Sequence, residues 1–244
     1  MFFSVITVVL NDLDNLKQTI ENVKKQSCQD YEYIIVDGGS SDGTLEYLNK
    51  ICQKDEKIRY ISEKDGGIYN AMNKGISLAR GEYILFLGAG DFLYHDKVFE
   101  EVKKYGKYDV IYGYGIFSSG ERKGKRIGTK LGLWAFLWDK VAAHQAVYVK
   151  TIIMQKYKFQ EKYKVQADQD ALMRMYRAGY RFKYLNKPLC YYDGLGFSSR
   201  KEFLQQNILD RVSMLKAYYP VLYKIRVIGH WIITRKKYDI YDDL

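Results

Sequence analysis

Acidic residues that directly follow predicted buried strands are the first candidates for chemistry in this sequence. Asp91 comes after the apolar run 82–87 and the short turn Gly88-Ala89-Gly90. In open α/β sheets ligands bind beyond the carboxyl ends of the strands, and glycines at that edge leave room for them. A carboxylate in this place can bind a divalent cation together with a phosphate. We therefore expect Asp91 to be a metal ligand.

Two further acidic residues lie in glycine-rich loops of the first third of the chain. Asp37 ends the apolar run 31–36, and Asp65 lies beside Glu63 and ahead of two glycines. Either aspartate could simply form a turn or cap a helix. The functional interpretation of Asp37 is that its carboxylate accepts hydrogen bonds from the imide N–H and the ribose of a nucleotide.

The second half of the chain offers a pair of acids and a histidine. Asp168 and Asp170 flank Gln169 at the predicted start of a helix, where acidic residues are also common because they complement the helix dipole. If that helix starts at the cleft, one of the two could accept a proton from an acceptor hydroxyl as a general base. His144 could be structural, or it could contact a metal or an acceptor.

Apolar periodicity predicts the elements that must position these residues. In the first half the predicted strands are 3–10, 31–36, 58–62 and 82–87, with helices around 16–23 and over 45–51 and 68–79. This alternation predicts an α/β protein with a parallel sheet and right-handed crossovers. Beyond Asp91 the predicted strands are 110–117, 144–149, 182–185 and 190–192, and the predicted helices are 98–104, 134–138 and a segment within 163–180.

The overall composition limits the class of protein. The 244 residues suffice for one large α/β domain or two small ones, and a hydrophobic fraction of 47% argues against global disorder. A formal charge of +10 favours an anionic partner, such as nucleic acid, a phosphorylated small molecule or an acidic membrane surface. The three cysteines lack metal-ligand spacing and are expected to be free thiols in a reducing compartment. Residues 1–10 resemble a buried strand more than a signal peptide, so we expect a cytoplasmic protein.

The C-terminal part of the chain is strongly basic. Residues 200–237 are predicted to be helical in at least two pieces that part near Pro220, and residues 211–237 contain seven Lys or Arg and no acid. Aliphatic residues and Trp231 are interleaved with these charges. A basic helix with an apolar side suits an anionic membrane surface, here the inner face of the cell membrane. The alternative is an ordinary solvated helix face that packs on the domain.

Taken together, the motifs resemble those of the family 2 glycosyltransferases, which have the GT-A fold, and in particular of bacterial enzymes that build surface polysaccharides. The resemblance covers most of the first 200 residues, and it is specific because several motifs occur in order. The matching runs are SVIT at 4–7, IVDGGSSDGT at 35–44, EKDGGIYNAMNKG at 63–75, ARGEYILFL at 79–87 with Asp91, HQ at 144–145 and DQD at 168–170.

This resemblance implies a Rossmann-like, mostly parallel sheet flanked by helices, with a catalytic domain over 1–199 and a helical basic tail over 200–244. Residues 1–91 would bind the nucleotide-sugar, and residues 92–199 would bind the acceptor. The implied partners are a UDP-sugar donor and a glycan acceptor, free or lipid-linked, as in the synthesis of O-antigen, capsule or exopolysaccharide.

The resemblance also implies roles for particular residues. In such enzymes the aspartate that matches Asp37 contacts uracil, the one that matches Asp91 ends the motif that binds Mn²⁺ or Mg²⁺, and the one that matches Asp168 is the catalytic base. Transfer inverts the anomeric centre in one in-line displacement. Nucleotide-sugar contacts are implied for Thr7, Asn11, Asp37, Ser40, Asp65, Gly67, Asn73, Lys74 and Gly90. Acceptor contacts are implied for His144, Gln145 and Asp170.

The metal motif departs from the family pattern. It usually carries more than one acid, whereas here Gly88-Ala89-Gly90 precedes Asp91. Metal affinity would then be weaker, or a second ligand such as His144 would assist. The Gln-x-x-Arg-Trp signature of processive synthases is absent, as are their membrane spans, which favours addition of a single sugar.

Three alternatives remain open on the sequence. Because the metal motif has only one acid, a catalytically silent nucleotide- or glycan-binding protein of the same fold is possible. The charge of +10 and the 24 tyrosines allow a nucleic-acid-binding protein, but no recognised nucleic-acid module is present and no such partner is expected. A nucleotidyltransferase would use a nucleoside triphosphate and release pyrophosphate. The aromatic content also leaves room for a homodimer.

Overall fold

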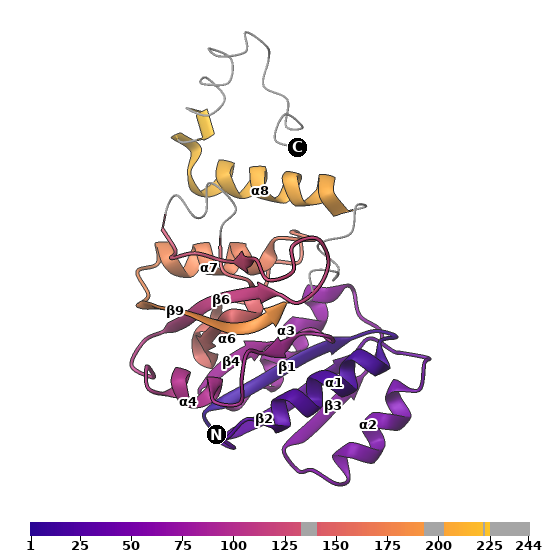
Figure 1. Ribbon diagram of the computed structural model, residues 1–244. Helices are drawn as coiled ribbons and strands as arrows, with labels where there is room; N and C mark the ends of the chain where they lie inside the picture. Colours follow the sequence, from indigo (N-terminus) through magenta and orange to yellow (C-terminus); the bar gives the residue numbers. More distant parts are fainter. Residues whose placement is uncertain (133–140, 193–202, 222, 225–244) are drawn as a thin grey trace.

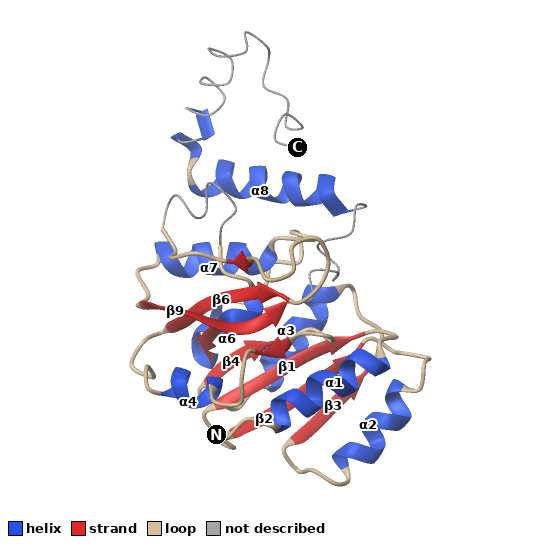
Figure 2. Cartoon of the chain, viewed as in Figure 1, coloured by secondary structure: helices blue, strands red, loops and turns tan. Residues whose placement is uncertain are grey.

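One mixed β-sheet with helices on both of its faces organises the molecule (Figures 1 and 2). In this computed structural model the described residues are 1–132, 141–192, 203–221 and 223–224. Their strands follow the order β3-β2-β1-β4-β8-β6-β9-β5, and β7 pairs with β6. Within that sheet β1, β2, β3, β4, β6 and β9 point in the same direction. The predicted α/β class with a mostly parallel sheet is therefore confirmed.

The first half of the chain forms the strictly parallel part of the sheet. Its strands are β1 (Phe3–Val9), β2 (Tyr31–Asp37), β3 (Ile58–Ser62) and β4 (Tyr83–Phe86), and its helices are α1 (Leu13–Lys24), α2 (Thr44–Cys52) and α3 (Ile68–Leu78). The register sets Val9 opposite Asp37, and Asp37 opposite Ser62. The predicted alternation is confirmed here, and the loops that follow these strands meet at one edge.

The second half extends the sheet and covers it with further helices. Its elements are β5 (Phe92–Leu93), α4 (Val98–Lys103), β6 (Val110–Phe117), β7 (Arg126–Ile127), the 3₁₀ helix η1 (His144–Ala146), β8 (Val147–Lys150), α6 (Thr151–Tyr157), α7 (Ala167–Arg177), β9 (Phe182–Tyr192) and α8 (Leu204–Tyr218). The helix predicted over 134–138 lies outside the described residues. In the basic tail, α8 ends two residues before Pro220, as predicted, and the residues after 224 lie outside the described ranges.

Two strand predictions in this half are wrong. The strand predicted over 144–149 begins only at Val147, because residues 144–146 form a 3₁₀ turn whose first two side chains reach acidic residues elsewhere in the fold. The strands predicted at 182–185 and 190–192 are one strand, β9, whose register against β6 shifts around Pro188. Proline has no N–H to donate and is tolerated at such an irregularity, so the run looked interrupted in the sequence.

Hydrophobic residues fill both faces of the sheet. Along β1 and β2 they alternate, so that Ile6 and Ile34 face α3 whereas Val5 and Tyr33 face α1. The predicted apolar face of α3 packs on the first of these clusters, and its members Ala71, Met72, Gly75, Ile76 and Ala79 are all buried. Strands covered on both faces give nearly continuous apolar runs, which is why the sequence identified them. No helix in the described ranges is long and apolar enough to cross a membrane.

Two motif glycines are required by close packing. A Cβ at position 75 would lie 2.5 Å from Cγ2 of Ile6, and a Cβ at position 81 would lie 2.6 Å from the backbone carbon of Phe3. Both distances are shorter than carbon atoms tolerate, so only glycine lets α3 lie on β1 and lets the chain turn from α3 into β4.

A buried carboxylate ties the opposite edge of the sheet together. Glu32 of β2 is 3% exposed, and its Oε1 accepts hydrogen bonds from the Ser4 hydroxyl and from the backbone N–H groups of Arg80 and Gly81. Its Oε2 lies 2.7 Å from the Arg59 guanidinium. Burial alone would raise the pKa of Glu32, but these donors outweigh it and lower the pKa below its usual value.

We predict that Glu32→Gln lowers the free energy of unfolding by about 2–3 kcal/mol at pH 7, because the Arg59 charge and two backbone donors lose an ionised acceptor. A carboxyl whose pKa is lowered in the folded state stabilises it above the unfolded pKa of about 4.5. The contribution is lost as the pH falls through the folded-state pKa, so the difference should shrink below about pH 4.

Urea unfolding followed by circular dichroism, at pH 7 and below about pH 4, measures the difference in unfolding free energy between the variant and the unchanged protein. Glu21→Gln is the matched control, since Glu21 is exposed and 3.9 Å from Lys24, and it should cost less than about 0.5 kcal/mol. Equal effects of the two substitutions would contradict the role given to Glu32.

Candidate active site at the carboxyl edge of the sheet

The loops after β1 and β2 are joined by hydrogen bonds at the carboxyl edge of the sheet. Asp37 is fully buried, and its carboxylate accepts hydrogen bonds from the hydroxyls of Ser40 and Ser62. The backbone N–H of Asn11 donates to the Ser40 hydroxyl at 2.8 Å, and the Asn11 side chain accepts from the N–H of Ser41 at 2.8 Å. The structure thus brings together three of the residues expected to contact a nucleotide-sugar, Asn11, Asp37 and Ser40.

The loop that contains Asp65 lies against the same place. A Cβ at Gly38 would lie 3.2 Å from Oδ2 of Asp65, so this carboxylate is beside the loop that follows Asp37. Lys74 of α3 holds it, with its ammonium 2.6 Å from Asp65 and 2.7 Å from Glu63. Hydrogen bonds to these two carboxylates raise the pKa of Lys74 above its usual value. Lys74 therefore fixes the loop on the helix that follows it.

Not every residue expected at this edge reaches it. Thr7 is fully buried in β1, and its hydroxyl lies 2.8 Å from the hydroxyl of Tyr33, inside the core. Asn73 faces the connection between α6 and α7, where its amide exchanges two hydrogen bonds of 2.9 Å with the backbone of Phe159. Gly67 does lie at the edge: its φ is +127°, and a Cβ there would meet no atom within 4 Å.

Asp91 ends a tight turn after β4 and is 5% exposed. Its Oδ2 accepts hydrogen bonds from the N–H of Gly88 at 2.9 Å and from the side-chain amide of Gln145 at 2.8 Å. A Cβ at Gly88 would lie 2.8 Å from that same oxygen, and Gly90 has a φ of +90°. Gly90 is thus required by the backbone conformation of the turn, and Gly88 leaves space for the Asp91 carboxylate.

The residues around Asp91 fit a divalent cation only in part. In the described ranges there is no group of three His, Cys, Asp or Glu side chains that could hold a metal. The side-chain oxygen of Gln145, which is 3% exposed, is buried without a hydrogen-bond partner and is a second hard oxygen beside Asp91. Mg²⁺ and Mn²⁺ accept carboxylate, amide and phosphate oxygens, so a cation here would take its remaining ligands from a bound diphosphate and water.

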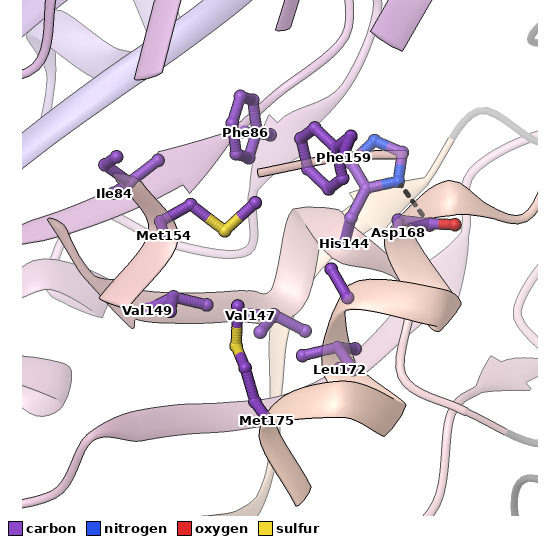
Figure 3. A pocket seen from close by; sticks show the side chains of 11 residues that line it. Ile84, Phe86, His144, Val147, Val149, Met154, Phe159, Asp168, Leu172 and Met175 are labelled. Carbon is purple, nitrogen blue, oxygen red and sulfur yellow. Dashed lines mark hydrogen bonds and ion pairs between the residues drawn. The ribbon is translucent and has the colours of Figure 1, made fainter. Parts of the chain in front are cut away.

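The second acid of the site lies at the first turn of α7. Asp168 Oδ2 is 3.2 Å from Nδ1 of His144 (Figure 3). Asp168 Oδ1 is 3.2 Å from the hydroxyl of Tyr69. Burial alone would lower the pKa of His144, but the hydrogen bond to Asp168 and the negative charges of Asp168 and Asp91 raise it above its usual value. The pKa of His144 therefore depends on the charges of both acids. Sequence reasoning did not single out Tyr69, although it lies within the motif over 63–75.

Adjacent residues connect the two acids. His144 contacts Asp168, and Gln145 contacts Asp91, from one 3₁₀ turn between β4 and α7. Asp37 joins the same edge because β2 and β4 both pair with β1 in parallel. The structure thus places acids 37, 91 and 168, which are far apart in the sequence, along one rim of the sheet.

Asp170 does not belong to this group. Two residues apart on a helix means a rotation of about 200°, so Asp170 faces away from Asp168. It is fully buried, with Oδ2 2.8 Å from the Arg174 guanidinium and Oδ1 accepting the Tyr218 hydroxyl at 2.6 Å. Asp170 thus joins α7 to α8 rather than facing the cleft.

The space behind His144 and Asp168 is apolar. A cavity of about 20 Å³ lies there, which is room for about one water molecule. Figure 3 shows the aliphatic, methionine and phenylalanine side chains around it, which come from β4, β8, α6 and α7 and from the segment around residue 159. The pair is therefore backed by core on this side, where no acceptor or nucleotide has room to bind.

Comparison with known proteins identifies the family of this chain. The family model described as Glycosyl transferase family 2 matches residues 4–189. A "PGL/p-HBAD biosynthesis glycosyltransferase" of Mycobacterium tuberculosis is 31% identical over 215 residues, which cover 84% of this chain and 83% of that relative. An "Uncharacterized glycosyltransferase" of Rickettsia felis is 37% identical over 124 residues, or 51% of this chain and 20% of its own.

Solved structures share the fold. S. aureus TarS 1-349 in complex with UDP-GlcNAc is similar with a TM-score of 0.68 at 19% identity, covering 90% of this chain and 68% of that one. This chain spans about half, 52%, of the longer TarS structure. A mannosyltransferase from Pyrobaculum calidifontis in complex with GDP-Man and Mn²⁺ has a TM-score of 0.64 at 14% identity, covering 91% of this chain and 64% of its own. With a family match that runs from β1 into β9, the chain belongs to glycosyl transferase family 2 and has the GT-A fold.

Proposed function

We propose that this glycosyltransferase moves one sugar from a UDP-sugar to a glycan acceptor, with inversion at the anomeric carbon. The observation that carries the proposal is the connection of Asp91 to Asp168 through the adjacent residues Gln145 and His144. One acid then lies where a diphosphate would leave, and the other lies where an acceptor hydroxyl would lose its proton. Support for the donor comes from TarS, whose solved complexes hold UDP-GlcNAc and UDP.

The donor would bind across the edge formed by the first three strands. Asp37 is the proposed acceptor for uracil or ribose. Three groups donate to its oxygens, the Ser40 and Ser62 hydroxyls and the backbone N–H of Ser40, which leaves about one of the four acceptor sites of an ionised carboxylate. The loop of Asp65, fixed by Lys74, would lie along the nucleotide. Gly67 and Gly90 would leave room for the backbone to approach the diphosphate.

Asp168 is the proposed general base. An oxygen of its carboxylate takes the proton of the acceptor hydroxyl while that hydroxyl oxygen forms a bond to the anomeric carbon of the donor sugar. The bond between the anomeric carbon and the diphosphate breaks in the same step, and its electron pair leaves with UDP. His144 and Tyr69 hold the two carboxylate oxygens in place while this happens.

Mn²⁺ or Mg²⁺ is the proposed cofactor, with Asp91 as its protein ligand. Such a cation, when bound, would neutralise negative charge that develops on the leaving diphosphate. Because Asp91 has few acidic neighbours in the described ranges, the affinity for the free cation should be low and should rise when the nucleotide supplies oxygens. The same scarcity favours the second candidate, a catalytically silent nucleotide- or glycan-binding protein of this fold.

A thermal-shift screen separates the donors. We expect UDP with Mn²⁺ at about 100 times its Kd to raise the melting temperature by roughly 5–10 °C, because binding to the folded form alone contributes about 2.7 kcal/mol. GDP and ATP serve as matched nucleotide controls and should give smaller shifts. A larger shift with GDP than with UDP would contradict the proposed donor class.

Substitution of the two acids tests the roles. Asp168→Asn keeps the size of the side chain but removes the base, so we expect UDP release in the presence of an acceptor to fall by a factor of about 10²–10⁴, with UDP affinity unchanged. Asp91→Ala should weaken the dependence of UDP binding on Mn²⁺. Asp14→Asn is the control, since Asp14 is 90% exposed on α1. Full turnover in both variants would show that these assignments are wrong, and donor binding without turnover on any acceptor would favour the silent protein.

The acceptor is proposed to be linked to a lipid diphosphate, as in the assembly of O-antigen, capsule or exopolysaccharide, with the protein peripheral to the inner face of the cell membrane. The described part of the basic tail contributes less to this than expected, because α8 buries Val212, Met214 and Leu215 against the domain. The proposal therefore rests on residues 225–237, which carry four Lys or Arg residues together with Trp231 and several isoleucines.

Co-sedimentation with vesicles tests this surface. We expect the full chain to bind vesicles that contain anionic lipid, and a chain that ends at Lys224 to lose most of that binding while it keeps UDP affinity and the docked helix α8. Added salt should weaken the binding, because the attraction to the headgroups is screened. Equal sedimentation of the two chains would contradict the membrane role of this segment.

A further inference from the structure

The segment that leads into Asp168 is held by hydrogen bonds from two different helices. From one side, the hydroxyl of Tyr69 in α3 lies 2.6 Å from the carbonyl oxygen of Val165 and 3.2 Å from Oδ1 of Asp168. From the other side, Oδ2 of Asp210 in α8 accepts the backbone N–H groups of Val165 at 2.8 Å and Gln166 at 3.3 Å. Residues 165–168 are thereby clamped between elements 96 and 45 residues away in the chain.

Tyr69 is a buried hydrogen-bond donor to this segment. It is 8% exposed, its ring lies 5.4 Å from that of Phe159, and its hydroxyl spans both ends of the segment 165–168. Burial and the nearby Asp168 charge raise the pKa of Tyr69 well above its usual value, so the hydroxyl keeps its proton. Tyr69 also lies two residues after Gly67, in the first turn of α3, so the loop proposed to contact the nucleotide runs directly into it.

Asp210 completes the clamp from α8, which lies along α7 on the side away from the sheet (Figure 1). It is 3% exposed, and Gln206 donates to its other oxygen at 2.7 Å. A second bond between the same elements runs from the Gln166 amide to Asn207 at 2.6 Å. A buried carboxylate on free N–H groups at a helix start is a strong, directional contact, so the start of α7 is fixed in both position and rotation.

We propose that Tyr69 is the positioning residue that aligns Asp168 for proton transfer, and that Asp210 holds the opposite side of the same segment. This inference rests on the proposed role of Asp168 as general base. The Tyr69 hydroxyl shares its one proton between the Val165 carbonyl and Oδ1, and the N–H of Gln169 donates to Oδ1 at 2.9 Å. Because His144 contacts Oδ2, the carboxylate cannot rotate about its Cβ–Cγ bond without breaking a hydrogen bond. α8 is therefore part of the catalytic apparatus rather than only a support for the basic tail.

Steady-state kinetics of Tyr69→Phe test the proposal. We expect kcat to fall by a factor of about 10–100, because a base that is misplaced by a fraction of an ångström transfers protons poorly. The KM values for donor and acceptor and the calorimetric Kd for UDP should change less than about threefold. Tyr83→Phe is the matched control, since this buried tyrosine donates to backbone carbonyl oxygens of Gly106 and Tyr108 at the far edge of the sheet. It should lose stability without loss of kcat.

Substitution of Asp210 tests the proposal independently, without a change at Tyr69. Asp210→Ala should lower kcat in the same way, whereas Asp210→Asn, which keeps an acceptor oxygen for the two N–H groups, should restore most of it. A folded Tyr69→Phe variant with normal kcat, or an Asp210→Ala variant with normal kcat, would overturn the inference if Asp168→Asn is inactive. Full activity of Asp168→Asn would instead refute the proposed base, so the two failures can be distinguished.

Discussion

The structure depends on one short turn that reaches two acids at once. His144 and Gln145 are consecutive, and their side chains contact Asp168 and Asp91 respectively. These acids belong to different halves of the chain, so a single 3₁₀ turn sets the distance between the proposed sites of proton removal and of diphosphate departure. The turn is followed by β8, which pairs antiparallel with both β4 and β6 at the centre of the sheet. Any shift of register in β8 would therefore move His144 and Gln145 away from the two acids.

Much of the family motif set serves the fold rather than the chemistry. Ser4 and Gly81 meet Glu32 at the edge opposite the candidate site, Thr7 lies in the core, and Gly75 lets α3 contact β1. These residues are nevertheless needed for the site, because a parallel sheet places its loops only as accurately as its strands are packed. A motif can thus identify a family correctly while it says little about which of its residues touch a ligand.

The sequence predicted the parallel half of the sheet because each strand there is buried on both faces and each helix has one apolar face. It predicted less of the second half, where His144 and Gln145 look like strand residues but their side chains turn toward acids, and where the register shift at Pro188 interrupts one long strand. The roles of Asp168 and Asp170 could not be separated by spacing alone. The contact that separates them, between Asp170 and Tyr218 of α8, joins residues 48 positions apart in the sequence.

The same helix links the site to the basic tail. α8 contacts α7 and the segment before it through two buried aspartates. Asp170 of α7 accepts the Tyr218 hydroxyl of α8, and Asp210 of α8 accepts the backbone N–H of Val165 just before α7. Such contacts between buried charged groups and their donors resist sliding, because a displaced carboxylate would be left buried without its hydrogen bonds. A pull on the end of α8, such as attachment of the residues that follow it to a membrane, would then be transmitted to the segment that carries Asp168. The described helix α8 thus connects the start of the basic tail to the segment that carries Asp168.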